Sequence, residues 1–135
     1  MKIKTLIATF SLIALVGISA CSLNSDDPYC FVRTGTPILG VSGATTTTIN
    51  TPITFSVGVQ ISNSCGAFNS FSETSGFPKD ITAIVDYNGC SCDQTESSLT
   101  EEYTFTATAA GTYELRFQTD DTEAPIVKTI TVTNE

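Results

Sequence analysis

The stretch ITFSVGVQI, residues 53–61, decides the fold of this 135-residue chain. Five apolar side chains alternate in it with small or polar side chains. Because successive side chains of a β-strand point to opposite faces of the sheet, this alternation directs one face into a core and the other toward water. The stretch therefore predicts a long, half-buried strand.

The same alternation returns in the last third of the chain. Residues 103–108 and 113–118 each alternate apolar and polar side chains, and Ala110-Gly111 between them is typical of a turn. Residues 126–132 predict a final strand. Lys128 interrupts the apolar alternation there, which indicates an edge position or a β-bulge.

The rest of the chain after residue 28 carries weaker strand patterns and no helical periodicity. Shorter strands are expected at residues 29–34, 38–41 and 81–87. Residues 63–79 carry Asn, Gly and Pro at intervals and residues 93–100 are polar, and both stretches predict irregular loops. Short strands at this spacing predict one all-β domain over residues 29–135, a two-sheet antiparallel sandwich of about seven strands.

Residues 1–20 predict a signal peptide. Lys2 and Lys4 precede an apolar run over residues 6–18 that is too short to span a bilayer comfortably, and small residues follow it. The last four residues of this region, Ile-Ser-Ala-Cys at 18–21, resemble the lipobox of bacterial lipoproteins. The resemblance implies cleavage before Cys21 and attachment of fatty acyl chains to that residue.

Residues 21–28 predict a lipidated cysteine followed by an acidic tether. Position 22 is Ser, not the Asp that resembles an inner-membrane retention signal, so the resemblance favours the outer membrane. The motif Ser25-Asp26-Asp27 resembles an acidic tag that sends some lipoproteins to the cell surface, and a plain solvated linker is an equal alternative. The cell surface and the periplasmic face both stay open.

Charge excludes one class of partner. Two of the six basic residues and none of the 14 acidic residues lie in the predicted signal peptide, so the remainder has a formal charge of −10. Such a chain repels phosphate backbones, and no nucleic acid is expected as a partner. Histidine is absent, which removes the commonest general base and the usual zinc ligand.

Residues 109–117, Ala-Ala-Gly-Thr-Tyr-Glu-Leu-Arg-Phe, resemble the segment that enters the penultimate strand of bacterial immunoglobulin-like and fibronectin-like domains. The resemblance implies an immunoglobulin-like sandwich in which the Tyr113 hydroxyl makes a corner hydrogen bond. Leu115 stands where an antibody domain carries a core cysteine, and tryptophan is absent. The whole chain is similar to small lipoproteins of Gram-negative bacteria that carry a β-sandwich behind a lipobox.

Once Cys21 is lipidated, four cysteines remain: Cys30, Cys65, Cys90 and Cys92. An even number in an exported domain predicts two disulfides, with three possible pairings. A Cys90–Cys92 bridge is disfavoured, because so small a ring strains the bridge geometry. We expect the pairs Cys65–Cys90 and Cys30–Cys92, and the exchanged pairing stays open.

Cys90-Ser91-Cys92 has a sharper alternative interpretation as a redox or soft-metal site. A redox thiol needs a lowered pKa, and the nearest charged residues in sequence, Asp86 and Asp93, act in the opposite direction. Structural bridging is therefore preferred, and a protein that handles thiols, disulfides or soft metals is kept as the alternative function.

Two other groups are candidates for binding. Phe68, Phe71 and Phe77 form a possible binding loop that could stack on a sugar or fill a partner's pocket, although such rings more often pack beneath their loop. Asp120, Asp121 and Glu123 share one predicted loop. Oxygen-rich loops can bind calcium, but this one lacks the spacing of a dedicated site, and a solubilising turn is preferred.

These observations predict a non-catalytic, lipid-anchored domain of the outer membrane that uses no cofactor or metal. It would act by protein–protein or glycan contact, as an accessory of an envelope assembly. A carbohydrate-active enzyme is a second alternative, and it would require a cleft with paired carboxylates.

Overall fold

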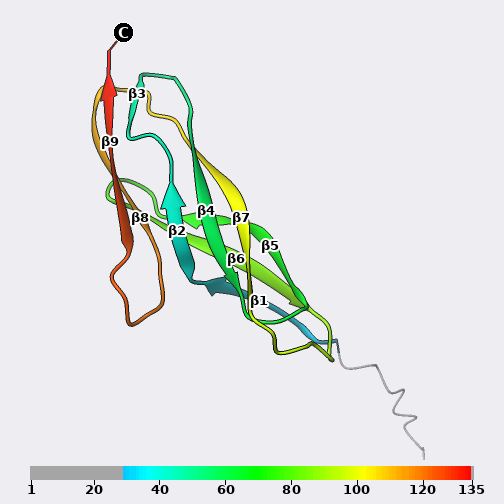
Figure 1. Cartoon of the computed structure of the whole chain (residues 1–135). Coiled ribbons are helices and arrows are strands. Elements are labelled where there is room, and N and C mark those ends of the chain that lie inside the picture. The colour runs from blue at the N-terminus through cyan, green and yellow to red at the C-terminus, as the bar shows by residue number, and fades with distance from the viewer. Residues whose placement is uncertain (1–28, 135) are drawn as a thin grey trace, which may run out of the picture.

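The computed structural model describes residues 29–134, and the predicted signal peptide, Cys21 and the whole predicted tether lie outside this range. Across the described residues the chain forms nine strands, without a helix (Figure 1). The strands are β1 (Phe31–Thr36), β2 (Ile38–Ser42), β3 (Thr46–Thr48), β4 (Ile53–Ile61), β5 (Gly66–Glu73), β6 (Lys79–Asn88), β7 (Ser97–Phe105), β8 (Gly111–Phe117) and β9 (Ile126–Thr133). No helix in this range is long and apolar enough to cross a membrane.

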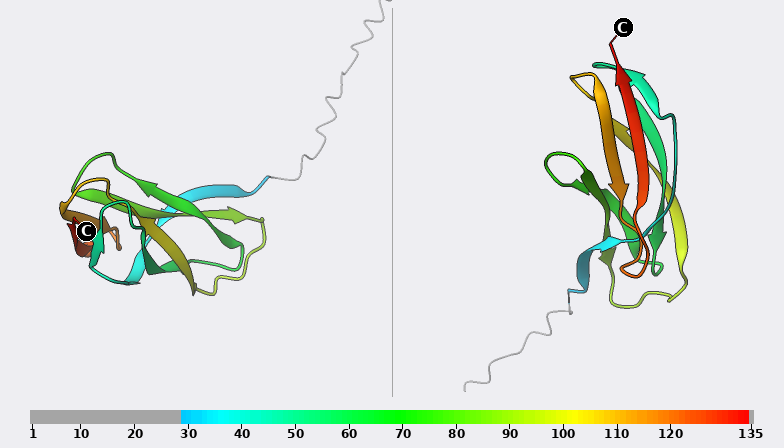
Figure 2. Two further views of the ribbon diagram at one scale, coloured as in Figure 1. Left: turned by 90° about the horizontal axis from the view of Figure 1, so that it is seen from above. Right: turned by 90° about the vertical axis from the view of Figure 1, so that its left-hand side faces the viewer.

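The strands form two sheets. One contains β1, β6, β8, β9 and β3 in that order, with β5 added beside β6, and the other contains β2, β4 and β7. The turn between β5 and β6 projects from the side of the molecule (Figure 2). The prediction of an all-β, two-sheet sandwich is confirmed, whereas the expected number of about seven strands is wrong.

Two predicted loops contain strands. Residues 66–73 form β5, and their alternation is hidden because the register shifts by one residue between Phe68 and Ser70. The predicted loop at 93–100 contains the start of β7. This strand has β4 as its one neighbour and lies at the edge of its sheet, so its first half can stay polar.

The sheets are not wholly antiparallel as predicted. β3 pairs in parallel with β9, and β6 pairs in parallel with β8 over three residues. β3 lies within a Thr-rich connection between longer strands, which gives no apolar alternation to detect. On one side of β9, Lys128 pairs with Leu115 of β8. On the other side, β3 pairs only with residues Thr131–Thr133 of β9 and does not extend to Lys128. Lys128 therefore lies on an edge, one of the two arrangements predicted for it, and no bulge occurs in this pairing.

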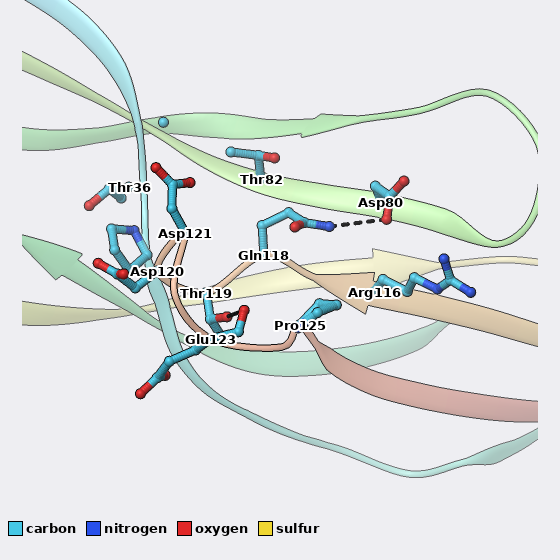
Figure 3. A pocket seen from close by; sticks show the side chains of 12 residues that line it. Thr36, Asp80, Thr82, Arg116, Gln118, Thr119, Asp120, Asp121, Glu123 and Pro125 are labelled. Carbon is cyan, nitrogen blue, oxygen red and sulfur yellow. Dashed lines mark hydrogen bonds between the residues drawn. The ribbon is translucent and has the colours of Figure 1, made fainter.

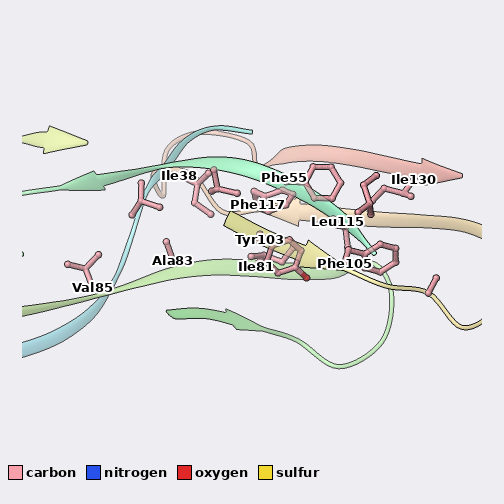
Figure 4. Packing of buried hydrophobic residues seen from close by; sticks show 14 of the residues in the cluster. Ile38, Phe55, Ile81, Ala83, Val85, Tyr103, Phe105, Leu115, Phe117 and Ile130 are labelled. Carbon is pink, nitrogen blue, oxygen red and sulfur yellow. The ribbon is translucent and has the colours of Figure 1, made fainter. Parts of the chain in front are cut away.

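The core confirms the prediction that residues 53–61 form a long strand with its apolar side chains buried on one face. Phe55, Val57 and Val59 of β4 are fully buried in one cluster with Leu115 and Phe117 of β8. Figure 4 shows Phe55 near Phe117 in this core, with their ring centroids 6.1 Å apart. The hydroxyl of Tyr113 donates a hydrogen bond of 2.8 Å to the carbonyl of Ala109, so the expected corner bond is present.

The chain crosses from one sheet to the other between β1 and β2. Thr36, a buried polar residue, donates its hydroxyl to the carbonyl of Gln60 at 2.7 Å. The carbonyl of Pro37 accepts from the Gln60 amide, and the Ile38 amide donates to the carbonyl of Gln118. These bonds satisfy the backbone at the crossover and fix one wall of a groove described below.

Candidate functional site

All four cysteines of the described range gather at one end of the sandwich. Cys30, immediately before β1, bonds to Cys90, and Cys65, between β4 and β5, bonds to Cys92. The prediction of two disulfides is confirmed. The expected pairs Cys65–Cys90 and Cys30–Cys92 are wrong, since the structure has the exchanged pairing.

The strand register explains the pairing. β1 lies antiparallel to β6 with Phe31 opposite Asn88, and the Gly89 amide donates to the carbonyl of Cys30 at 2.9 Å. Cys30 therefore meets Cys90. The chain beyond Cys90 turns toward the β4–β5 connection, where it places Cys92 beside Cys65. Sequence reasoning could not find this, because it had no evidence that β1 pairs with β6.

Gly89 is required at this end of the sandwich. Its φ is +151°, and a Cβ added there would lie 2.7 Å from the Sγ of Cys65. L side chains rarely adopt this conformation, and the approach is too close for any of them. The glycine lets the Cys65–Cys92 bridge lie against the backbone of residue 89, directly before Cys90. We name this end, with Cys30, Cys65, Gly89, Cys90 and Cys92, the disulfide clasp.

In the disulfide clasp both Cys90 and Cys92 are bridged, so neither carries a thiol in this structure. Each is bonded to a different partner, so the two do not form a redox pair with each other. A bridged sulfur is not the thiolate that binds soft metals. Within residues 29–134 no group of three or more Cys, Asp or Glu side chains is placed to hold a metal ion.

The structure does not bring the three candidate phenylalanines together. Phe68 and Phe71 lie on β5 with ring centroids 4.9 Å apart, and both pack against the core. Phe77 lies in the β5–β6 turn and is 48% exposed. Its ring meets Tyr113 edge to face at 4.8 Å, and the Lys79 ammonium lies 5.5 Å from its centroid.

A polar groove of about 860 Å³ lies where the β1–β2 crossover, β6, β8 and the β8–β9 loop meet (Figure 3). Four carboxylates and one guanidinium line it: Asp80, Asp120, Asp121, Glu123 and Arg116. Gln118 donates its amide to Asp80 at 3.0 Å. The groove therefore offers fixed hydrogen-bonding groups within a negative field.

The β8–β9 loop is held by its own side chains. Asp120 accepts hydrogen bonds from the amide and the hydroxyl of Thr122, at 3.0 and 2.8 Å. These bonds lower the pKa of Asp120. A catalytic general acid needs the opposite shift of its pKa.

Sequence reasoning found the loop carboxylates of this groove but missed Asp80, Arg116 and Gln118. These three residues come from β6, from β8 and from the residue after β8. Their sequence positions carry no motif that distinguishes them from ordinary solvated strand residues. Only the pairing of β6 with β8 brings them together.

A second polar contact links the edges of the two sheets. Tyr103 of β7 donates its hydroxyl to Glu73 of β5 at 2.7 Å, and Lys79 lies 3.2 Å from the same carboxylate. The Tyr103 hydrogen bond is the largest cause of the lowered pKa of Glu73, and Lys79 adds to it. Burial and Glu73 raise the pKa of Tyr103.

This contact predicts a pH dependence of stability. Because the pKa of Glu73 is lower in the folded state, its contribution is present above the ordinary pKa of 4.5 and is lost as the pH falls through the folded value. We expect Glu73→Gln to destabilise the protein at pH 7, and the loss to shrink toward pH 3. Thermal unfolding at a series of pH values measures this, with Glu102→Gln on β7 as the charge-matched control. An equal effect of Glu73→Gln at both pH values would contradict the prediction.

Comparisons of the chain with protein-family models, with curated proteins and with solved structures found no match. The functional argument therefore rests on the residues and their geometry. Two features support this argument. One is the disulfide clasp at the N-terminal end of the sandwich, and the other is the polar groove between the β1–β2 crossover, β6, β8 and the β8–β9 loop.

Proposed function

We propose that the protein is a non-catalytic, lipid-anchored β-sandwich of a bacterial outer membrane. It acts through protein or glycan contact, as an accessory of an envelope assembly. One observation supports this most. The two disulfides join the end of the sandwich at which the chain enters from the predicted tether, so the point of attachment is covalently reinforced.

The location proposed here agrees with the cysteine chemistry. Disulfides persist in oxidising compartments such as the periplasm and the cell surface, and an exported protein passes through them. The lipobox-like residues 18–21 supply the anchor, and two or more acyl chains hold a protein stably at a membrane. Anchoring also raises the effective concentration of the domain toward other membrane proteins, so weak contacts suffice.

We also propose that the sandwich is a variant of the immunoglobulin-like fold. The hydrogen bond from Tyr113 to Ala109 and the β8–β9 hairpin support this relation. The nine strands, the parallel pairing of β6 with β8 and the extra strand β1 beside β6 distinguish the variant.

The polar groove is the proposed contact surface. Its carboxylates outnumber its guanidinium by four to one, which favours a basic partner. Among the residues that line it in the described part of the chain there is no aromatic ring, the usual platform for a sugar. A basic protein segment therefore fits the groove better than a glycan does.

The anchor is tested by Cys21→Ser in the full chain, expressed in a Gram-negative host. We expect this variant to leave the membrane fraction, because the acylated sulfur is gone. Ser22→Ala is the matched control and should stay in the membrane fraction. Retention of the Cys21→Ser variant in the membrane to the control level would overturn the proposal.

The contact surface is tested by photo-crosslinking in the same cells. A photoreactive residue replacing Glu123 in the groove should capture an envelope protein, and one replacing the exposed Thr104 on β7 should not. Equal capture from both positions, or none from Glu123, would remove the groove from the proposal.

A further inference from the structure

Exposed apolar side chains concentrate where the described chain begins. Six large hydrophobic residues are exposed among residues 29–134, and three of them lie within the first four positions. Tyr29 is 82% exposed, Val32 is 58% exposed and Phe31 is 36% exposed. We name these three residues the apolar tip. Water is an unfavourable environment for such a group, so its position calls for an explanation.

The side chains of the apolar tip point in different directions. Phe31 and Val32 are consecutive in β1 and therefore lie on opposite faces of the sheet, opposite Asn88 and Tyr87 of β6. The ring of Tyr29 stacks on that of Phe31, with centroids 5.9 Å apart. A rigid partner pressed on one face would cover only part of this group. A fluid surface that surrounds the end of the strand can cover all of it.

The covalent structure places a membrane within reach. Eight peptide units separate Tyr29 from Cys21, and a fully extended chain of that length spans at most about 28 Å. If Cys21 carries the lipid, the apolar tip is the part of the described chain with the shortest connection to the bilayer. The C-terminus lies at the opposite end of the sandwich (Figure 1).

The charges at the tip indicate which lipids it suits. The Arg33 guanidinium lies 5.8 Å from the centre of the Phe31 ring and is bound to both oxygens of Asp86, at 2.6 and 2.7 Å. That ion pair neutralises the cation. The tip therefore has apolar and aromatic contact to offer, without attraction to anionic headgroups.

We propose that Tyr29, Phe31 and Val32 insert into the headgroup region of the bilayer that holds the anchor. This proposal rests on the lipid anchor proposed above and adds a second contact to it. Tyr rings favour the boundary between headgroups and acyl chains, where the ring is sheltered and the hydroxyl stays hydrated. The contact stands the sandwich on its disulfide clasp and directs the opposite end away from the membrane.

The test uses residues 21–135, which contain all the strands, both disulfides and the buried core found in the described residues 29–134. With the other cysteines bridged, the Cys21 thiol can be coupled to a maleimide lipid in phosphatidylcholine nanodiscs that carry gadolinium-chelating headgroups. NMR relaxation of the backbone amides then reports their distance from the headgroups. We expect the strongest relaxation at residues 29–33.

The decisive comparison is between two double variants. Tyr29→Ser with Phe31→Ser should reduce the paramagnetic relaxation at residues 30–34 by about three-fold or more, because the tip then lacks its rings. Leu39→Ser with Val127→Ser removes two exposed apolar side chains elsewhere and should leave the relaxation unchanged. Replacing part of the phosphatidylcholine with phosphatidylglycerol should not increase it.

Equal relaxation in the wild type and the tip variant would overturn the insertion, since the tether alone would then explain the proximity. A clear increase with phosphatidylglycerol would also overturn it, in favour of a charge contact. The nanodisc supplies the lipid chemically, so these results do not depend on acylation in cells. Failure of the anchor itself appears separately, in the membrane fractionation of Cys21→Ser.

Discussion

Removing the Cys30–Cys90 bridge with Cys30→Ser and Cys90→Ser is expected to lower the free energy of unfolding by about 4 kcal/mol. The bridge joins residues 60 positions apart, and it therefore removes much conformational freedom from the unfolded chain. The Cys65–Cys92 bridge closes a shorter loop, of 27 positions, and its removal is expected to cost about 3.5 kcal/mol.

The first bridge has an additional mechanical role. β1 has β6 as its one neighbour in the sheet, and its pairing begins with Phe31 opposite Asn88. Cys30–Cys90 lies just outside that first pair. A force applied at the N-terminal side is therefore transmitted to the end of β6 through the Cys30–Cys90 bridge, before it can separate β1 from β6. Loss of the bridge exposes β1 to separation from its free end.

Urea unfolding followed by circular dichroism measures both costs, and hydrogen exchange measures the role of β1. In the variant without Cys30–Cys90, the amides of residues 31–36 should exchange much faster than in the wild type. In the variant without Cys65–Cys92, the same amides should stay better protected than in the first variant. A loss below about 1 kcal/mol in both variants would contradict the account, because each bridge would then add little to the fold.

The second large effect is expected from Phe117→Ala, at about 3–5 kcal/mol. Phe117 is fully buried, and its ring centroid lies 6.1 Å from that of Phe55 and 5.5 Å from that of Tyr103. These partners belong to the three-stranded sheet, whereas Phe117 belongs to the six-stranded sheet. The substitution leaves a cavity at the centre of the contact between the sheets, which the rigid strands cannot close.

Phe77→Ala is the matched control, since it removes the same ring from a turn where it is 48% exposed. We expect a loss of about 1 kcal/mol or less there, from its edge-to-face contacts with Phe105 and Tyr113. Urea unfolding of both variants gives the comparison. Equal losses would show that the core is not centred on Phe117.

The sequence predicts the centre of this fold better than its edges. Residues 53–61 and 113–117 face a core on one side and water on the other, so their alternation is strict. β5 and the first half of β7 lie at sheet edges, where a register shift and solvated polar residues hide the pattern. β3 is held by parallel pairing with a distant strand, for which local sequence holds no signal.

The residues of the candidate site also divide into those that the sequence predicts and those that it does not. The loop carboxylates Asp120, Asp121 and Glu123 were recognisable because they cluster in sequence. Their neighbours across the groove are contributed by β6 and β8, and only the tertiary fold joins them. The cysteine partners likewise depend on which strands pair. Local patterns predict that bridges form, but the partners are decided by contacts between distant parts of the chain.

The most direct measurement of the central claim is the mass of the intact protein extracted from its native membrane without reduction. The account predicts a chain that starts at Cys21, carries two or more fatty acyl groups, and gains four alkylation sites when its two bridges are reduced. A chain that retains residues 1–20, or one that lacks acyl groups, would contradict it.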